Sequence, residues 1–340
     1  MTLPDRLSEQ AVPASLDGLL GLCAPSMDQV NEVILSRMAS DVPLIPELAG
    51  HLIAAGGKRM RPMLCVAGAI AASGQTDVPE EALKLAAAVE FIHSATLLHD
   101  DVIDKSDKRR GRDTANALWG NEASVLVGDF LFARAFELMV ETDDLAILGM
   151  LSSASARITE GEVKQMTMVG APDSPLADYL SVITNKTAIL FAAAAEAGGR
   201  VGGGDTELCQ ALHTYGLHLG MAFQICDDAL DYEAAPADMG KNAGDDFYEG
   251  KITLPVILAW QDGSADERAF WQRTLGDGDI KDSDLDTARA CLTRHEAVPR
   301  ALSFAREEID KATAALEILA DGPVKTALTA AALFAGRRAY

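Results

Sequence analysis

Three aspartates close together are the first residues of this chain that could carry chemistry. Asp100, Asp101 and Asp104 stand near the end of a largely apolar stretch, residues 78–111. Three like charges at such spacing are unfavourable unless a cation lies among them. Carboxylates four residues apart suit Mg²⁺, a hard ion that takes oxygen ligands and shares substrate phosphates. Taken alone, the cluster could equally be a solvated acidic helix end, because such clusters are common on protein surfaces.

A second cluster and a pair of arginines favour the metal interpretation. Asp227, Asp228 and Asp231 repeat the same spacing in another apolar helical pattern. Arg109 and Arg110 follow the first cluster, and guanidinium groups match the geometry of phosphate oxygens. Two such clusters on separate helices could face each other across a cavity and hold a diphosphate through several Mg²⁺ ions. A chance repeat on a polar surface is less expected, because both clusters interrupt strongly apolar helices.

A third candidate site is the basic turn at residues 56–62, GGKRMRP. Its two glycines can end a helix and let backbone approach a ligand, and Pro62 suits the first position of the next helix. Lys58 and Arg61 would then stand at a helix N-terminus, where an anion is favoured. By itself the turn could be an ordinary helix connection with solvated bases. Together with two acidic clusters, it is better interpreted as a second anion site.

The elements that position these residues are predicted to be helices. Of the 340 residues, 49% are hydrophobic but only 5% are aromatic, which favours packed helices, and no segment alternates convincingly like a strand. No proline falls between Pro79 and Pro172, as long uninterrupted helices require. On the helical period His93, Asp100 and Asp104 share one face.

The chain is expected to form one structural domain. Residues 1–25 are expected to be a loose leader, and residues 26–340 to form a single all-α domain. Ser26 is expected to cap the first helix. A second helix is predicted from Pro46 to Ala55.

Charge and composition exclude several classes of function. The formal net charge of −22 disfavours binding to nucleic acid and to anionic lipid. No run of eighteen apolar residues is present, and the N-terminus lacks a basic-then-apolar signal pattern. The five cysteines are scattered without metal-ligand spacing, so we expect reduced core residues in a cytoplasmic protein.

Five motifs in order resemble those of one enzyme family. They are GGKRMRP, LLHDDVID followed by RRG, KTA at residues 186–188, FQICDDALD and then GKNAGDD. From about residue 27 to its end, the chain resembles the trans-isoprenyl diphosphate synthases, also called polyprenyl synthetases. The resemblance implies an all-α bundle of long helices around a deep central cavity, usually assembled as a homodimer. It also implies condensation of isopentenyl diphosphate with an allylic diphosphate, expected to be farnesyl or geranylgeranyl diphosphate.

The resemblance also implies a role for each matching residue, and none of these positions departs from the family pattern. Three Mg²⁺ ions, which Mn²⁺ can replace, would be held by Asp100, Asp104 and Asp227. Asp101, Asp228 and Asp231 would support them. The residues that would bind isopentenyl diphosphate are Lys58, Arg61, His93 and Arg110. Those that would contact the allylic diphosphate or stabilise the carbocation are Arg109, Lys186, Thr187, Phe223, Gln224, Lys241 and Lys251.

Further polar residues have weaker assignments. His93 shares the Asp100 face and is expected to bind substrate rather than to be a satisfied core histidine. His99 lies about 100° away around the helix and is expected to be structural. Glu162 and Gln165 are expected to belong to a buried polar network. Asp245 and Asp246 are expected to orient Lys241 and Lys251 or to reach a metal-bound water.

Product length is predicted from the residues below the first cluster. Ala95 and Thr96 precede Asp100 by five and four residues. Relatives that stop at short chains typically have aromatic residues there, or two inserted residues in the motif, and this sequence has neither. We therefore predict a long-chain product, of the kind used as a quinone side chain, with the tunnel floor formed by Phe132, Met166 or Met168. Alternatively, Ala95 is small only because two helices touch there.

Three alternatives remain at this point. A shorter-chain farnesyl or geranylgeranyl synthase would share every motif. A class I terpene cyclase would not need the basic turn or His93, and a non-catalytic partner subunit would be expected to have lost aspartates. The hydrophobic product also implies transient association with membranes.

Overall fold

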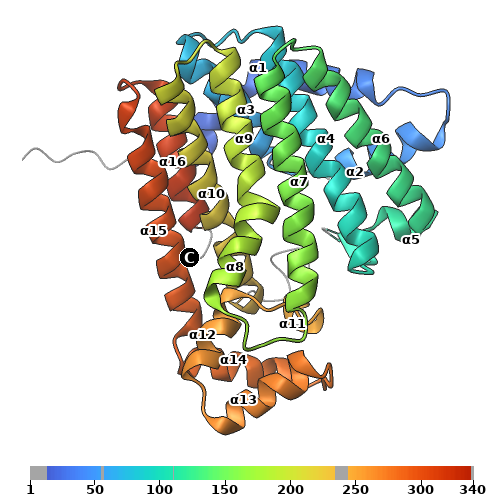
Figure 1. The fold of residues 1–340 in the computed structure, drawn as a ribbon, viewed down its shortest axis with the longest axis vertical. Helices are drawn as coiled ribbons and strands as arrows, with labels where there is room; N and C mark the ends of the chain where they lie inside the picture. Colours follow the sequence, from blue (N-terminus) through green and yellow to red (C-terminus); the bar gives the residue numbers. More distant parts are fainter. Residues whose placement is uncertain (1–13, 55–56, 110, 234–243, 338–340) are drawn as a thin grey trace, which may run out of the picture.

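The computed structural model describes residues 14–54, 57–109, 111–233 and 244–337, and most of them are helical (Figure 1). The first ten helices are α1 (Asp17–Arg37), α2 (Leu44–Ala54), α3 (Met60–Ser73), α4 (Glu80–Ile103), α5 (Ala115–Trp119), α6 (Asn121–Val140), α7 (Leu145–Met168), α8 (Leu176–Ile183), α9 (Ile189–Val201) and α10 (Thr206–Glu233). The others are α11 (Asp245–Tyr248), α12 (Leu254–Asp262), α13 (Ala265–Trp271), α14 (Asp284–Arg294), α15 (Ala297–Ala315) and α16 (Pro323–Arg337).

Three short helical segments and one pair of strands complete the described fold. The π-helices are η1 (Thr184–Ala188) and η2 (Gln272–Gly276), and η3 (Leu316–Ile318) is a 3₁₀-helix. Strand β1 (Lys108–Arg109) pairs antiparallel with β2 (Arg112–Asp113). The all-α prediction is therefore confirmed, and this small pairing is the part that the sequence patterns missed.

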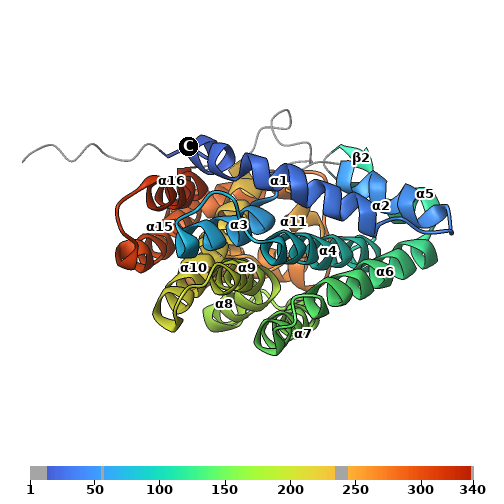
Figure 2. The ribbon, with the colours of Figure 1, turned by 90° about the horizontal axis from the view of Figure 1, so that it is seen from above.

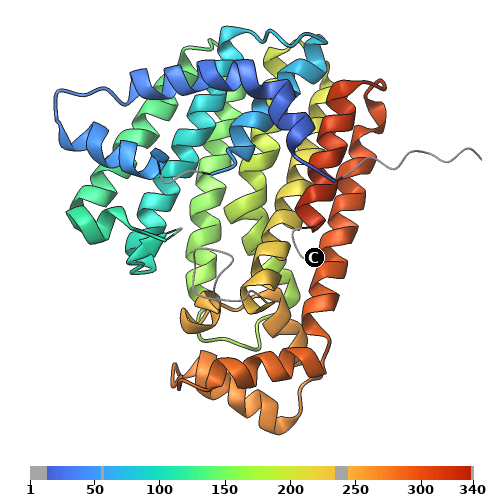
Figure 3. The same cartoon turned by 180° about the vertical axis from the view of Figure 1, so that it is seen from behind.

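The long helices α4, α6, α7, α9, α10 and α15 run roughly along one direction and form a bundle (Figure 1). Within it α10 packs between α9 and α15, α3 packs on α9, and α4 packs on α6. Helix α1 crosses one end of the bundle over α3 and α4, as seen from above in Figure 2 and from behind in Figure 3. Helices α12 to α14 cover the opposite end.

Small residues allow the inner helices to approach closely, which explains how a chain with so few aromatics builds its core. A Cβ added at Gly198 of α9 would lie 1.8 Å from the carbonyl oxygen of Cys65 on α3. Such contact has no room for a side chain, so close packing here depends on glycine and alanine. The main core lies between α1, α3, α4, α6, α9 and α10, and a second core around Trp271 and Phe247 fixes the end that carries α11.

The first helix begins earlier than the sequence indicated. Helix α1 starts at Asp17, so residues 17–25 are not a loose leader, and Ser26 lies buried within the helix rather than at its start. Pro25 lies inside α1, where it removes one backbone hydrogen bond and its ring crowds the preceding turn. Burial of Leu19, Val30 and other apolar side chains of α1 in the main core outweighs that loss. Residues 1–13 lie outside the described residues, so the leader expected there stays a prediction.

Two smaller expectations can be compared with the structure. Helix α3 begins at Met60, two residues before the proline that was expected to start it. All five cysteines are buried thiols, as the sequence indicated. Within the described part of the chain, no helix combines the length and the apolarity that crossing a membrane requires.

Candidate active site

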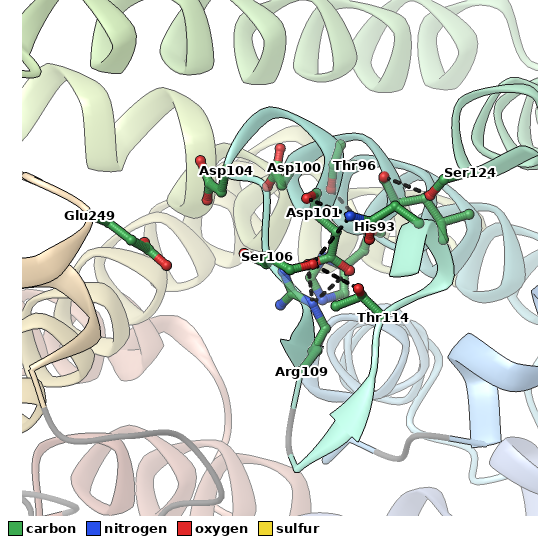
Figure 4. Close-up of polar contacts among 12 residues, drawn as sticks. His93, Thr96, Asp100, Asp101, Asp104, Ser106, Arg109, Thr114, Ser124 and Glu249 are labelled. Carbon is green, nitrogen blue, oxygen red and sulfur yellow. Dashed lines mark hydrogen bonds and ion pairs between the residues drawn. The ribbon is translucent and has the colours of Figure 1, made fainter. Parts of the chain in front are cut away.

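The first aspartate cluster lies at the C-terminal end of α4. Asp100 and Asp104 lie on the same side of this helix end, whereas Asp101 points toward Arg109 (Figure 4). Arg109 donates to Asp101 through Nε at 2.9 Å and through Nη2 at 2.7 Å. The β1–β2 pairing holds Arg109 in place for this contact, because it folds the chain back directly after the cluster. Asp101 therefore anchors an arginine and leaves the other two carboxylates for a ligand.

The electrostatics of Asp100 favour an added cation. Its pKa is raised to about 6, chiefly by burial and also by the nearby carboxylates of Glu162 and Asp104, against the lowering effect of Lys186 and Arg109. A carboxyl group with a raised pKa is one whose charge is incompletely compensated by its surroundings. This end of α4 would therefore be stabilised by a bound divalent ion.

The second cluster, on α10, is deeper. Asp228 is buried and accepts hydrogen bonds from the Tyr179 hydroxyl at 2.6 Å and from Gln224 Nε2 at 2.8 Å. The pKa of Asp228 is raised to about 8, chiefly by burial and also by the charges of Asp246 and Asp227, although the two hydrogen bonds lower it. Asp227, on the neighbouring face, is only half-buried. The charged form of Asp228 would therefore be stabilised by a nearby cation.

A single lysine connects the two clusters. Lys251, which follows α11, has its Nζ 3.2 Å from Asp104 Oδ2 and 2.5 Å from Glu249 Oε2. Its backbone N–H donates to the Asp246 carbonyl, and the Asp246 N–H donates to Asp231 Oδ2 at 3.1 Å. The end of α4 and the end of α10 are therefore joined through one short segment. Burial alone would lower the pKa of Lys251, but Asp246, Asp104 and Glu249 together raise it, so this lysine is charged.

A second lysine, Lys186, lies near Asp100 of the first cluster. Lys186 lies in the π-helix η1. Its Nζ forms an ion pair with Glu162, donates a hydrogen bond to Gln165 Oε1 at 2.8 Å, and lies 3.9 Å from Asp100. The next residue, Thr187, donates from its hydroxyl to Gln224 Oε1 at 2.9 Å. Gln224 in turn donates to the second cluster. The KTA segment therefore contacts residues beside both aspartate clusters.

The basic turn forms a separate cationic area against aromatic rings. Lys58 Nζ lies 4.4 Å from the centre of the Phe334 ring on α16, and the Arg61 guanidinium lies 4.4 Å from the Phe191 ring on α9. Phe191 also packs on Phe223, with ring centres 5.8 Å apart. Cation–π contacts of this kind hold a charge in place without neutralising it. Both cations thus remain suited to bind an anion.

The positions of several other predicted site residues are known, but their contacts do not test the predicted roles in substrate binding. His93 is half-buried on α4, and its carbonyl accepts a hydrogen bond from Thr96. Arg110 and Lys241 lie outside the described residues. Asp245 begins α11 beside Asp246. His99 stacks on Phe132 and lies within 3.2 Å of the Val125 carbonyl, an arrangement that fits its structural assignment.

The residues expected to control product length lie in the core below the first cluster. Ala95 is fully buried and Thr96 is half-buried, and the α4 residues one to two turns deeper are buried as well. Met166 was one of the residues predicted to form the tunnel floor, but it is 56% exposed. A side chain that points outward from α7 cannot close an enclosed tunnel, so this part of the prediction is wrong. Met168 is buried with the second core.

Sequence patterns missed several residues that the structure brings to the site. Tyr179 and Glu249 contact Asp228 and Lys251 directly, and Phe191 and Phe334 lie against the basic turn. Tyr179 stands two helical turns before Lys186, so the helical period could have suggested it. The phenylalanines gave no signal, because an aromatic residue on an apolar helix is ordinarily a core residue.

The donor set fits Mg²⁺. All the groups are carboxylate oxygens, which a hard divalent ion prefers. Asp100 is half-buried and Asp228 is buried, and both have raised pKa values. The neighbouring Lys186, Lys251 and Arg109 would complement a phosphate group that such an ion shares. Among the residues that the structure describes, no three potential ligands converge on one point. Oxygens of the diphosphate and of water would therefore have to complete the coordination of each ion, which is how Mg²⁺ is commonly bound.

Comparisons with known proteins point the same way. Residues 42–292 match the family model described as "Polyprenyl synthetase". The chain is 43% identical over 326 residues to octaprenyl diphosphate synthase of Haemophilus influenzae, covering 96% of this chain and 98% of that protein. It is also similar to a crystal structure of a polyprenyl synthase from Caulobacter crescentus complexed with calcium and isoprenyl diphosphate, with 48% identity, a TM-score of 0.92 and coverage of 99% and 100%. A decaprenyl diphosphate synthase from Rhodobacter capsulatus gives 48% identity, a TM-score of 0.91 and coverage of 96% and 100%.

Proposed function

This chain belongs to the polyprenyl synthetase family, and we propose that it condenses isopentenyl diphosphate with an allylic diphosphate to build a long all-trans chain. One observation carries the proposal. Lys251 pairs with Asp104 of the first cluster, while the segment before it binds Asp231 of the second. That arrangement leaves two sets of carboxylates and several cations around one place, as a metal-bound diphosphate requires.

The aspartates would hold the metal. In the proposal Asp100, Asp104 and Asp227 bind three Mg²⁺ ions, and Asp228 and Asp231 support them. When bound, Mg²⁺ supplies the positive charge that makes diphosphate a better leaving group. The calcium in the related Caulobacter crescentus structure supports a divalent-ion site in this family.

The chain's own cations act on the leaving diphosphate. Arg109, Lys186 and Lys251 compensate the negative charge that develops as the allylic C–O bond breaks. Lys241 is proposed for the same role. The bond's electron pair leaves with the diphosphate, and the allylic carbon becomes a cation. Thr187 and the backbone carbonyls near it stabilise that cation, and the buried apolar helices exclude water from it.

The second substrate is bound on the basic turn. Lys58, Arg61 and His93, together with Arg110, are proposed to hold the diphosphate of isopentenyl diphosphate. Its double bond then attacks the allylic cation, forming the new C–C bond. A proton leaves the resulting cation and is taken up by the released diphosphate, so no covalent link to the enzyme is needed. Phe223 and Gln224 line the space between the two substrates.

The product is proposed to be long. Support comes from the small Ala95 and Thr96 below the first cluster, and from related proteins named octaprenyl and decaprenyl diphosphate synthase. Every added unit buries more apolar surface, at roughly 25 cal/mol per Å². A quinone side chain is the proposed use, with farnesyl or geranylgeranyl diphosphate as the primer. The hydrophobic product would associate transiently with membranes.

We also propose that the enzyme is a homodimer. Helices α6 and α7 form one outer side of the bundle (Figure 2) and expose large apolar side chains. Leu145 is 84% exposed and Leu126 is 67% exposed, and the others on this side are Val125, Phe136, Val140, Val163 and Met166. A second copy would cover this side, because large exposed apolar patches mark association surfaces.

The test is to incubate the purified protein with farnesyl diphosphate, isopentenyl diphosphate and Mg²⁺, and to size the products by mass spectrometry. The proposal predicts products of several added units that require all three components. Products that stop at geranylgeranyl length would support the shorter-chain alternative. A cyclic hydrocarbon formed without isopentenyl diphosphate would support a terpene cyclase, and no turnover would support a non-catalytic subunit.

A further inference from the structure

The π-helix η1 aims two consecutive site residues at different neighbours. Lys186 contacts Glu162 and Gln165 on α7 and lies near Asp100 on α4, whereas Thr187 contacts Gln224 on α10. A π-helical turn inserts one extra residue between α8 and α9, so both flanking helices keep their own buried faces. This widened turn is less favourable than an α-helical turn, so something must hold it.

One face of α7 makes the necessary contacts. Arg157 donates from Nε at 3.0 Å and from Nη2 at 2.9 Å to the side-chain oxygen of Asn185, the residue before Lys186. Gly161 stands four residues after Arg157, and Gln165 four residues after Gly161, so the three lie along one stripe of the helix. Along this stripe, the guanidinium of Arg157, the backbone of Gly161 and the side-chain amide of Gln165 each contact η1.

Gly161 is the point of closest approach. A Cβ added there would lie 2.7 Å from the backbone nitrogen of Lys186 and 3.0 Å from the Cβ of Asn185. Both contacts are with groups that cannot rotate away, so a side chain at this position would push η1 off α7. The glycine is thus required for the distance at which Lys186 reaches Glu162.

We propose that Arg157, Asn185 and Gly161 are positioning residues that hold η1 in its π-helical register and thereby aim Lys186 at the leaving diphosphate. The inference rests on the proposed function, because it assigns a consequence for catalysis to the placement of Lys186. None of the three residues needs to touch substrate. Their effect passes through the backbone of η1, on which both Lys186 and Thr187 are carried.

The expected consequence is a loss of turnover with little change in binding of the second substrate. Displacing a catalytic group by about 1 Å can lower a rate by about 100-fold. Isopentenyl diphosphate is proposed to bind Lys58 and Arg61, which are carried by the basic turn and not by η1, so its KM should change little. A role in fold stability alone would lower the melting temperature and leave kcat of the folded enzyme unchanged.

The test uses three variants and one matched control. Asn185→Leu removes the acceptor for Arg157, Asn185→Asp keeps it, and Gly161→Ala adds the obstructing Cβ. Gly149→Ala is the control, because Gly149 lies on the same helix with nothing within 4 Å of an added Cβ. We expect Asn185→Leu and Gly161→Ala to lower kcat by about 10- to 100-fold, and to leave the KM for isopentenyl diphosphate within about twofold. Asn185→Asp and Gly149→Ala should remain near the parent.

Amide hydrogen exchange of residues 184–190 supplies a readout that needs no turnover. We expect faster exchange in this segment for Asn185→Leu and Gly161→Ala, and not for Asn185→Asp or Gly149→Ala. An unchanged kcat in both disruptive variants would overturn the inference, as would an equal loss in Gly149→Ala. A parent protein that lacks prenyltransferase activity would instead overturn the proposed function, while the exchange data would still show whether the three residues hold η1.

Discussion

Lys251 lies 3.2 Å from Asp104 although 147 positions separate them in the chain. The contact places the segment after α11 against the end of α4, while Asp246 within α11 donates its backbone N–H to Asp231 on α10. Figure 4 shows Glu249, the other partner of Lys251, across from Asp104. Two acidic clusters far apart in sequence therefore border one place.

Removing either cluster should abolish most of the activity. Asp100→Ala or Asp227→Ala should lower kcat by about 100-fold or more, because charge stabilisation of the leaving group is lost. Circular dichroism should show an unchanged fold, since each variant relieves crowding among carboxylates. Asp282→Ala, an exposed position far from both clusters in sequence, is the control. Near-normal turnover in the cluster variants would remove the metal assignment.

The stabilising effect of Mg²⁺ should depend on pH. Asp228 and Asp100 have pKa values raised to about 8 and about 6 by burial, so without metal the folded protein binds more protons than the unfolded chain. Their contribution to the free energy of unfolding therefore falls as the pH rises from about 4 toward about 8. Bound Mg²⁺ offsets this loss because it favours the charged carboxylates. The increase in Tm on adding Mg²⁺ should be larger at about pH 8 than at about pH 5.5.

Asp228→Asn supplies the control for this pH dependence. The asparagine does not titrate, so the difference in Tm between this variant and the parent, measured without metal, should change between about pH 5.5 and about pH 8. The parent should lose stability relative to the variant as the pH rises. A difference that stays constant across this range would show that Asp228 does not have a raised pKa.

Phe334 should affect binding of one substrate selectively. Its ring holds Lys58 at 4.4 Å, so Phe334→Leu should keep the apolar packing but release the ammonium group. A cation–π contact contributes about 0.5–2 kcal/mol, which corresponds to an increase of about two- to thirtyfold in the KM for isopentenyl diphosphate. The KM for the allylic substrate should not change, and Phe334→Tyr should behave like the parent.

Two controls separate loss of the Lys58–Phe334 contact from displacement of helix α16. In a Lys58→Met background, Phe334→Leu should cause no further increase, because the contact is already absent. Leu333→Ala alters the same helix beside Phe334 without removing the ring. An equal rise in KM for Leu333→Ala would attribute the effect to the placement of α16.

Bulky residues below the first cluster should shorten the product. Ala95 is fully buried, so Ala95→Phe together with Thr96→Phe places two rings in the space proposed for the growing chain. Mass spectrometry of the products should show fewer added units, while consumption of the allylic primer continues. Products of unchanged length would show that the growing chain does not pass Ala95 and Thr96. The alternative would then be favoured, in which Ala95 is small only because two helices touch there.

Much of the site could be predicted because its signals are local. The D-D-x-x-D spacing defines both clusters on their helices without knowledge of the fold, and the arginine pair follows within ten residues. The all-α class followed from composition and from the distribution of prolines. These signals do not depend on how the helices pack.

The remaining features depend on packing between distant segments. Nothing near Lys251 in sequence indicates that it reaches Asp104, and nothing near Lys58 indicates Phe334, because each pair meets only when the bundle forms. The π-helical turn at η1 has no sequence signal of its own, since its neighbours on α7 maintain it. The start of α1 at Asp17 depends on burial of its apolar side chains, which is defined only once the bundle has formed.

The most direct test of the shared diphosphate site is a crystal structure of the protein with Mn²⁺ and inorganic diphosphate, with metal positions taken from anomalous scattering. We predict ions that bridge one diphosphate to Asp100 and Asp104 on one side and to Asp227 on the other. Ions confined to one cluster, with the diphosphate out of reach of the other, would contradict this account.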